Sequence, residues 1–150
     1  MFPKTMTQIE IKELPFGSTI QKESIALRTR ILRTPIGFKF SDKELAAECS
    51  EFHLAALIHN KLVGILLLKP ISKNEIKMRQ VAIDTDMQNK GIGTRLIEFA
   101  ENLAKSEGYQ IMSLHARETA VPFYLKANYK IEGKSFIEVG LPHYQMTKIL

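Results

Sequence analysis

The sequence predicts an α/β (α+β) fold with a mixed central sheet, contained in a single domain of residues 1–150. Segments with the two-residue alternation of strands are interspersed with segments whose apolar residues recur at helical spacing. Their order is strand, two helices, three strands, helix, strand, helix and two strands. With 45% hydrophobic and 25% charged residues, a chain of 150 residues can also bury one substantial core. Together these features favour helices packed against one sheet.

The first half of the chain is expected to hold one strand, two helices and a three-stranded meander. Alternation in "TQIEIKEL" predicts a strand over residues 7–14, and a helix follows over residues 18–32. Ser41 and Glu44 have the spacing of a capping box and open a second helix, which runs through Cys49. The stretch "FHLAALIHNKLVGILLLKP" is typical of a hairpin that turns at residues 59–61, and "NEIKMRQVAID" is the third strand.

The second half of the chain alternates helices with strands. A helix from Ile92 is predicted because apolar residues recur on one face, and Gly108 would cap its end. That face comprises Ile92, Leu96, Phe99, Ala100 and Leu103, and the residues expected to point away from it are Glu98, Glu101 and Lys105. The remaining elements are the strands "YQIMSLHAR", "KIEGKSFIEVG" and "YQMTKIL" and one short helix, "TAVPFYLKAN".

Composition narrows the function classes. No apolar run is long enough to span a membrane, and the stretch "MFPKTMTQIEIK" lacks the apolar core of a signal peptide. The lone cysteine, Cys49, excludes an internal disulfide framework, so a cytoplasmic location is expected. The scattered histidines lack metal-ligand spacing, and no metal is expected. The formal charge of +5 suits an anionic ligand, but without an aromatic and basic cluster no nucleic-acid partner is expected.

The stretch "QNKGIGTRLIEFAENLAKSEG", residues 88–108, places two glycines in a polar turn that opens a helix. A dinucleotide-binding fingerprint is excluded because Leu96 occupies the position of its third glycine, and no phosphate loop of nucleotide-binding proteins occurs. The first N–H groups of the helix can bind an anion, and Gly91 and Gly93 would let a phosphate approach the backbone. A helix start that merely tolerates glycine is the alternative, and the local sequence does not decide between the two.

A second motif decides in favour of the anion site. One strand downstream, "ETAVPFYLKANY" carries the pattern Ala-x-x-Phe-Tyr-x-x-x-x-Tyr on a short helix. Together with "VAIDTDMQNKGIGTRLI", it resembles the GNAT superfamily of acyl-coenzyme-A-dependent N-acyltransferases, most specifically over residues 75–133. The element order extends the resemblance to the whole chain, and "FIEVGLPHYQM" resembles a small bacterial branch of unknown substrate. The resemblance implies a mixed, mostly antiparallel sheet of about seven strands flanked by about four helices.

The resemblance also implies acetyl-CoA as the cosubstrate and assigns residues that bind it. Pantetheine would insert like an extra strand into a V-shaped opening and pair with the backbone of Val81, Ala82 and Ile83. The pyrophosphate would be held by the backbone N–H groups of Gln88, Asn89, Lys90, Gly91, Ile92, Gly93 and Thr94. The side chains of Gln88 and Lys90 would approach its charge, and the alternative for Lys90 is an ordinary solvated lysine.

For the chemistry, the resemblance places Tyr124 near the coenzyme sulfur. An amine would attack the thioester directly, a backbone N–H of the "VAI" strand would stabilise the oxyanion, and Tyr124 would assist the leaving thiolate. Because a tyrosine pKa is about 10 and a thiol pKa about 8.5, hydrogen bonding counts as much as full proton donation. The alternative for Tyr124 is an aromatic core residue beside Phe123.

The chain departs from the family pattern where the acceptor amine loses its proton. Many members carry a glutamate near the start of the third meander strand, whereas Arg79 and Gln80 offer no base. His143, just behind a restraining proline, leads His53 as the candidate base, and a chain of water molecules or a less basic amine are the alternatives. Two further departures are His115, where asparagine is frequent, and Asn128, expected in a left-handed cap usually given to glycine.

The predicted function is acetyl transfer from acetyl-CoA to the amine of a small molecule or a protein. A non-catalytic module that senses acyl-CoA with the same fold is the alternative. The retained Tyr124 favours catalysis, and the missing carboxylate weakly opposes it. Homodimers are common in the superfamily, so a homodimer is a further expectation, and no membrane partner is expected.

Overall fold

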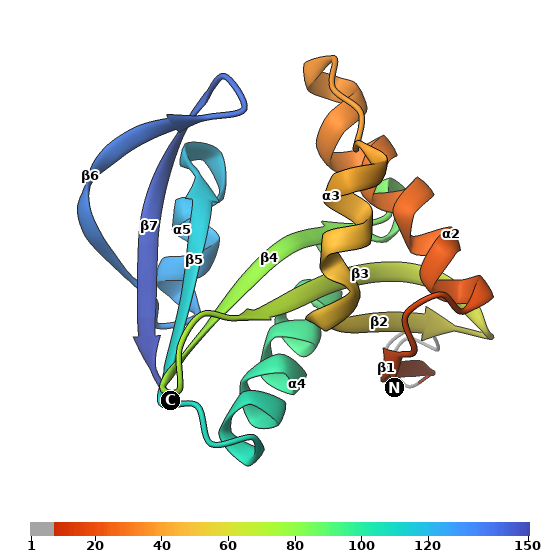
Figure 1. Cartoon of the computed structure of the whole chain (residues 1–150), viewed down its shortest axis with the longest axis horizontal. Helices are drawn as coiled ribbons and strands as arrows, with labels where there is room; N and C mark the ends of the chain where they lie inside the picture. Colours follow the sequence, from red (N-terminus) through yellow and green to blue (C-terminus); the bar gives the residue numbers. More distant parts are fainter. Residues whose placement is uncertain (1–7) are drawn as a thin grey trace. The chain divides into compact units, whose positions relative to one another are not determined.

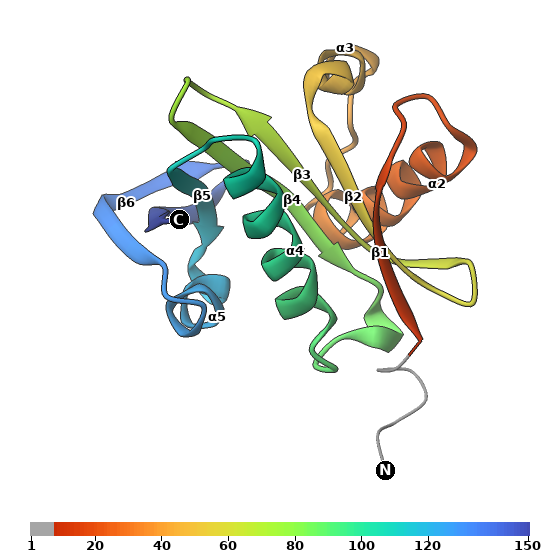
Figure 2. The ribbon, with the colours of Figure 1, turned by 90° about the horizontal axis from the view of Figure 1, so that it is seen from below.

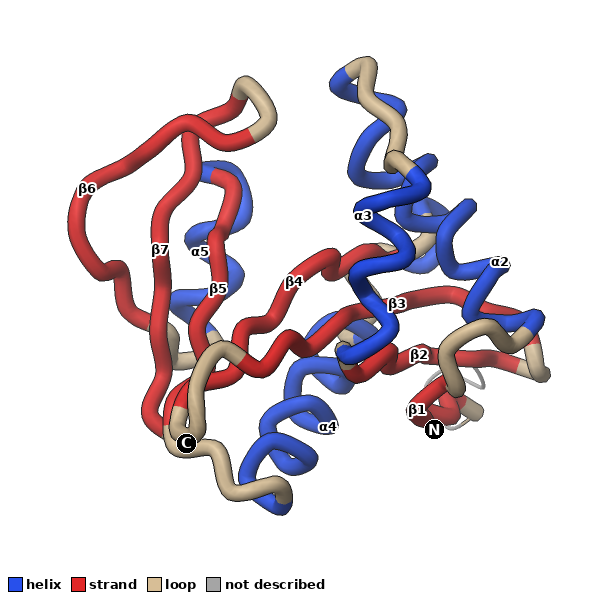
Figure 3. The backbone as a smooth tube through the Cα atoms, in the orientation of Figure 1, coloured by secondary structure: helices blue, strands red, loops and turns tan. Residues whose placement is uncertain are grey.

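A computed structural model describes residues 8–150 of the chain (Figure 1). Its strands are β1 (Ile9–Leu14), β2 (Phe52–Ile58), β3 (Lys61–Pro70), β4 (Glu75–Ile83), β5 (Ile111–Arg117), β6 (Lys130–Glu138) and β7 (Leu141–Ile149). Its α-helices are α2 (Thr19–Arg28), α3 (Asp42–Ala46), α4 (Ile92–Ser106) and α5 (Val121–Lys126) (Figure 3). The predicted order of strands and helices is confirmed over the described residues, whereas the predicted first strand residue, Thr7, lies outside them.

The strands form one sheet in the order β1-β2-β3-β4-β5-β7-β6. The pairs β1–β2, β2–β3, β5–β7 and β6–β7 are antiparallel, and β4 pairs with β5 in parallel. The prediction of a mixed, mostly antiparallel sheet of about seven strands is therefore confirmed. The chain divides into two compact units. The first comprises the residues up to Lys69 together with Gln80–Ala100, and the second comprises Pro70–Arg79 and Glu101–Leu150.

The first unit contains β1, the β2–β3 hairpin and the end of β4, with helices on both faces of these strands. The β2–β3 turn falls at His59 and Asn60, whose φ angles of 50° and 63° are those of a tight hairpin turn, and this confirms the predicted turn. On one face, α2 packs against the sheet through a core cluster of Leu14, Leu27, Ala55, Leu57, Ile65, Leu67 and Ala82. The other face carries the first half of α4 (Figure 2).

Gly64 of β3 allows α4 to approach the sheet closely. A Cβ atom at this position would lie 2.8 Å from Cδ1 of Ile83 and 3.1 Å from Cδ1 of Leu96. Real Cβ atoms do not approach other carbon atoms as closely as 2.8 Å, so a larger residue would require the ends of the Ile83 and Leu96 side chains to shift. Gly64 therefore leaves room for the side chains of Ile83 and Leu96.

The predicted helix starts are confirmed, whereas the helix ends differ. The Ser18 hydroxyl accepts from the amide of Gln21, and Ser41 and Glu44 form the expected reciprocal capping box. The helix predicted over residues 18–32 is α-helical to Arg28 and continues as a π-helix over Thr29–Arg33. The helix predicted through Cys49 changes to a 3-10 helix after α3, over Ala47–Ser50.

The second unit is built on β5, β7 and β6. Met112, Leu114 and Met146 are buried on one face of these strands, as their alternation along β5 and β7 requires. The short helix α5 ends at a turn in which Asn128 has a φ of 71°, so the predicted left-handed cap is confirmed. One predicted boundary was wrong: the last strand begins at Leu141 rather than at residue 144, because the β6–β7 turn is only two residues long.

Glu101 is the other correction. Its predicted position on the solvent side of α4 was wrong, because the side chain is only 8% exposed. It is buried among polar partners that come from distant parts of the chain, and these are described with the site below. Over the described residues, no helix has both the length and the apolar character required to cross a membrane.

Candidate functional site

The predicted coenzyme-binding loop is an exposed turn that leads directly into α4. Gln88, Asn89, Lys90 and Gly91 are all exposed, whereas Ile92 is buried and anchors the first turn of the helix. Asn89 and Gly91 have positive φ angles of 61° and 81°. Left-handed residues within a turn aim successive backbone N–H groups toward one side, which is the backbone geometry of anion-binding loops. Thr94 and the half-buried Gly93 complete the first turn, where the N–H groups of a helix have no intrahelical acceptor.

One side chain of this loop is already used within it. The Gln88 side-chain amide donates to the backbone carbonyl of Ile83 at 3.0 Å, which ties the loop to the end of β4. Gln88 thus positions the loop, whereas the predicted approach of its side chain to a pyrophosphate stays a prediction. Lys90 is exposed, so a ligand role and an ordinary solvated lysine both remain compatible with its position.

The backbone of β4 bends immediately before the predicted pantetheine-binding residues. Gln80 has a φ of 58°, which is unusual for a residue with a long side chain and marks a local break in the strand. Val81, Ala82 and Ile83 follow the break, and Ala82 is buried in the core cluster while its two neighbours are half-buried. The Gln80 side-chain oxygen accepts from Nε of Arg28 at 3.4 Å, so α2 contacts the bend directly.

Arg28 is itself held by a buried carboxylate. Its Nη1 and Nη2 atoms donate to Oε1 and Oε2 of Glu48 at 2.8 and 2.7 Å, and its guanidinium lies 4.6 Å from the ring centroid of Phe40. Arg28 and Glu48 are 0% and 2% exposed. This fixed guanidinium is a component of the first unit that the sequence analysis did not identify.

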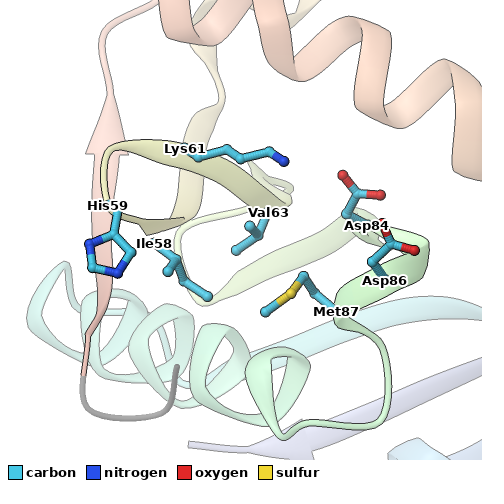
Figure 4. A pocket seen from close by; sticks show the side chains of 7 residues that line it. All are labelled: Ile58, His59, Lys61, Val63, Asp84, Asp86 and Met87. Atoms are coloured by element: carbon cyan, nitrogen blue, oxygen red, sulfur yellow. The ribbon is translucent and has the colours of Figure 1, made fainter. Parts of the chain in front are cut away.

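A pocket of about 460 Å³ lies beside the loop but does not include it. It is lined by Ile58, His59, Lys61, Val63, Asp84, Asp86 and Met87. Figure 4 shows His59 and Lys61 on the hairpin side of this pocket and the two carboxylates on the other side. Two carboxylates disfavour a diphosphate, so the loop that follows Met87, rather than this pocket, is the candidate pyrophosphate site.

In the second unit, Tyr124 is a buried residue of α5. It is 8% exposed, and its ring packs edge-on against the rings of Phe123 and Tyr129, with centroids 5.2 and 5.9 Å away. Burial raises the pKa of Tyr124 to about 12. The phenol is therefore protonated at any physiological pH, so it can donate a hydrogen bond but releases its proton reluctantly.

A buried polar network fixes the segment that follows Tyr124. The Tyr129 hydroxyl donates to Oε2 of Glu101 at 2.7 Å, and Nζ of Lys148 lies 3.0 Å from both carboxylate oxygens. Lys148 also donates to the backbone carbonyl of Ala127 at 3.0 Å. Burial, followed by the hydrogen bond to Glu101, raises the pKa of Tyr129 above its ordinary value. The network thus links α4, the end of α5 and β7, and its member Tyr129 packs against the Tyr124 ring.

The other predicted catalytic residue, His143, lies within β7 and is 4% exposed. Its Nδ1 atom is 2.9 Å from the backbone carbonyl of Leu141, and its Nε2 atom is 3.7 Å from Oε2 of Glu138. The imidazole also stacks on Phe136, with centroids 6.0 Å apart and an angle of 27° between the rings. Pro142, directly ahead of His143, pairs with Ile137 of β6 inside the sheet.

His115 is part of the same group of side chains. Its Nδ1 atom lies 3.0 Å from Oε1 of Glu138 and 3.3 Å from Nζ of Lys77. The sequence analysis did not identify Glu138, which lies on β6 in the second unit. The signal that could have found it is the hairpin register, because a two-residue turn after Glu138 brings it close to His143.

The remaining histidines, His53 and His59, lie in the first unit. His53 is buried in the first unit, and its Nε2 atom lies 2.9 Å from the Glu48 carbonyl, whereas Nδ1 has no hydrogen-bond partner among the described residues. His59 is exposed in the hairpin turn, as expected. Among the described residues, no three histidine, cysteine or carboxylate side chains form a group that could hold a metal ion.

The predicted site residues thus fall into two groups, one in each unit. Val81–Ile83 and Gln88–Thr94 belong to the first unit, and Tyr124 and His143 belong to the second. Within the second unit, His143 pairs with Arg117, the last residue of β5, and the short helical segment that leads into α5 begins at the next residue. His143 therefore lies at the end of β5 from which the chain leads into α5.

Comparisons with known proteins give the family of the chain. A sequence profile of the acetyltransferase (GNAT) domain matches residues 32–150. A candidate acetyltransferase of Bacillus subtilis (strain 168) is 27% identical over 115 residues, which cover 76% of this chain and 76% of that protein.

Two solved structures share the fold. A GNAT family acetyltransferase from Elizabethkingia anophelis with acetyl-CoA bound has a TM-score of 0.75 and 19% identity, covering 95% of this chain and 99% of its own. An aminoglycoside 6'-N-acetyltransferase complexed with coenzyme A has a TM-score of 0.78 and 19% identity, covering 93% of this chain and 96% of its own. Since the family profile spans most of the sequence, the chain belongs to the GNAT acetyltransferase family.

Proposed function

We propose that this chain transfers the acetyl group of acetyl-CoA to the amine of a small molecule or a protein, by direct attack in a ternary complex. The observation that carries the proposal is the exposed loop at residues 88–91, whose left-handed Asn89 and Gly91 lead into the free N–H groups of α4. Two proteins of the same fold hold acetyl-CoA or coenzyme A, which supports the same cosubstrate.

In this proposal, the backbone of the first unit binds the coenzyme. The N–H groups of Gln88–Thr94 hold the pyrophosphate, where the helix dipole of α4 adds to their effect. The amides of pantetheine pair with the backbone of Val81–Ile83 in the manner of an added strand. The register of β4 with β5 supports this pairing. The parallel pairing of the two strands ends at Met78, whereas β4 itself continues to Ile83, so the last residues of β4 extend beyond it.

In the second unit, Tyr124 acts on the leaving group. The acceptor nitrogen forms a bond to the thioester carbon, the oxyanion is stabilised by a backbone N–H of β4, and the C–S bond then breaks. Because the pKa of Tyr124 is raised to about 12, its hydroxyl stays protonated and donates a hydrogen bond to the thiolate rather than giving up its proton outright.

His143 is the proposed base in this reaction. A typical alkyl amine is almost fully protonated at neutral pH and must lose one proton before it can attack. Nε2 of His143 takes this first proton and passes it to solvent. After the C–N bond has formed, the nitrogen loses a second proton, which reaches the thiolate sulfur. If His143 is not the base, the alternatives are a chain of water molecules that carries the proton away or an acceptor amine that is less basic.

Coenzyme binding can be tested without knowing the acceptor. A Gly93→Glu variant places a bulky carboxylate in the first turn of α4 and should weaken the binding of coenzyme A by at least about tenfold, or 1.4 kcal/mol. The matched control is Asn102→Glu, which adds the same charge at an exposed position further along the same helix. Isothermal calorimetry showing equal affinity for both folded variants would remove the loop from the site.

Turnover requires a separate assay. Release of free thiol from acetyl-CoA should be followed over a panel of small amines and peptide amines, with mass spectrometry of the acetylated product. Product formation supports the transferase. Tight coenzyme binding without any transfer across the panel would instead favour an acyl-CoA sensor of the same fold.

A further inference from the structure

The second unit contains a group of four polar side chains, one from each of its strands, around a single carboxylate. Lys77 comes from β4, His115 from β5, Glu138 from β6 and His143 from β7. Oε1 of Glu138 lies 3.0 Å from Nδ1 of His115, and Oε2 lies 3.7 Å from Nε2 of His143. One carboxylate therefore lies next to both imidazoles.

The backbone of the β6–β7 turn sets the tautomer of His143. A carbonyl oxygen only accepts hydrogen bonds, so the 2.9 Å contact between Nδ1 of His143 and the Leu141 carbonyl places a proton on Nδ1. In the neutral imidazole, Nε2 is then the nitrogen with the free lone pair. This is the nitrogen that lies next to Glu138, so a proton taken up by Nε2 arrives beside a negative charge.

The proton on His115 is assigned by the same reasoning. Its Nδ1 atom is 3.0 Å from the carboxylate of Glu138 and 3.3 Å from the ammonium of Lys77. A carboxylate can only accept and an ammonium can only donate, so both contacts cannot be hydrogen bonds at once. Because Glu138 is ionised, Nδ1 of His115 carries the proton and donates a hydrogen bond to Oε1 of Glu138. Oε2 of Glu138 is then left for His143.

Charges from every neighbouring strand keep Glu138 ionised. Its partial burial raises the pKa, but the hydrogen bond from His115 and the charges of His115, His143 and Lys77 outweigh that effect. The pKa of Glu138 is therefore below its ordinary value of 4.5. Arg117 of β5 pairs with His143 in the β5–β7 register.

The turn between β6 and β7 holds this arrangement in place. It consists of Val139 and Gly140 at φ angles of 46° and 76°, and it joins Glu138 directly to Leu141, its partner in the register. The two groups that flank the His143 ring, a side-chain carboxylate and a backbone carbonyl, thus come from the two residues at the ends of one tight turn. Phe136 stacks on the same ring and limits its rotation.

We propose that Glu138 is a positioning residue for acetyl transfer, which stabilises the imidazolium that forms when Nε2 of His143 accepts the proton of the acceptor amine. This inference rests on the proposed function. Glu138 neither contacts the coenzyme nor accepts the substrate proton in this scheme. It supplies a negative charge beside Nε2 of His143, and it acts only through His143.

The test compares Glu138→Gln with a matched control, Glu132→Gln. Glu132 lies on the same strand, loses the same charge, and contacts Thr147 rather than either histidine. Histidine titrations followed by NMR on the folded chain should show a lower titration midpoint for His143 in Glu138→Gln than in the wild type, because a negative charge beside the imidazole is lost. The midpoint should stay unchanged in Glu132→Gln. An unmoved midpoint in Glu138→Gln overturns the proposal.

Kinetics supply the second readout. For an identified acceptor, Glu138→Gln should move the acidic limb of the kcat profile to lower pH and reduce the plateau several-fold, with the KM for acetyl-CoA unchanged. A lower plateau with an unmoved limb means a purely structural role and overturns this inference alone. Absence of transfer by the wild-type chain across the amine panel overturns the proposed function, and the NMR titration still reports whether the two side chains are coupled.

Discussion

The guanidinium of Arg28 and the carboxylate of Glu48 form a two-pronged ion pair, with N–O distances of 2.8 and 2.7 Å, in a site from which solvent is excluded. The pair joins α2 to the segment that follows α3, and it reaches the bend of β4 through Gln80. Because desolvation of two charges offsets much of their attraction, the pair is worth little net free energy but is costly to break on one side only.

A Glu48→Gln variant should therefore lower the free energy of unfolding by about 3–5 kcal/mol, since it leaves the Arg28 charge buried and uncompensated. The double variant Arg28→Met, Glu48→Leu removes both charges and should recover most of this loss. Urea denaturation of the three proteins measures both effects. If the single variant were as stable as the wild type, the site would be open to solvent in solution.

Tyr124→Phe should preserve the ring packing and remove the hydroxyl. Turnover should fall by about a hundredfold because the thiolate loses its hydrogen-bond donor, while calorimetric affinity for coenzyme A stays nearly unchanged. The control is Tyr144→Phe, which removes a hydroxyl from the neighbouring strand β7. Wild-type turnover by the Tyr124 variant would leave Tyr124 as a core residue only.

The raised pKa of Tyr124 can be observed directly. A tyrosine that ionises at a higher pH in the folded state contributes stability that is complete below the unfolded value and is lost as the pH rises through the folded value. The ultraviolet absorbance of phenolate should therefore show one tyrosine that ionises near pH 12, and Tyr124→Phe should abolish this component. An unchanged titration curve would show that the hydroxyl is accessible to solvent.

His143→Gln tests the proposed base. Glutamine keeps a polar side chain of similar reach but cannot take a proton, so the rate at neutral pH should fall by about a hundredfold. The acidic limb of the rate profile that a histidine base produces should also disappear. His59→Gln, in the exposed hairpin turn, is the control. A His143 variant with the wild-type rate and profile would favour a chain of water molecules.

Tyr129→Phe should destabilise the second unit without touching the ring contacts of Tyr124. The variant loses a buried hydrogen bond to a carboxylate, which is worth about 1.5–3 kcal/mol. Tyr109→Phe is the control, because Tyr109 is only half-buried. Chemical denaturation that gave equal midpoints for the two variants would mean that Glu101 finds another donor.

Local signals in the sequence predicted much of the fold correctly. Alternation located the strands, the Ser41 and Glu44 pair located a helix start, and the left-handed Asn128 was foreseen from the end of the short helix. Each of these depends on residues that are close together in the chain. The same locality explains why the glycine loop can be identified from the amino-acid sequence alone.

The side-chain contacts that were missed depend on partners far away in the sequence. Glu101 was expected to face solvent because its helical position is outside the apolar stripe, but Lys148 and Tyr129 meet it inside the protein. The role of Glu138 depends on His115, which lies on a different strand. The pairing of Arg28 with Glu48 likewise has no local signature, because arginine in a helix is ordinarily solvated.

The parallel pairing of Glu75–Met78 with Ile111–Leu114 also bears on the order in which the chain assembles. The hairpins β2–β3 and β6–β7 close over two-residue turns, so their strands meet at small entropic cost and on a microsecond timescale. Joining β4 to β5 instead requires a loop that contains all of α4, and this is the slower kind of contact to form. We therefore expect the parallel pair to close after both hairpins, which makes it the step that sets the folding rate.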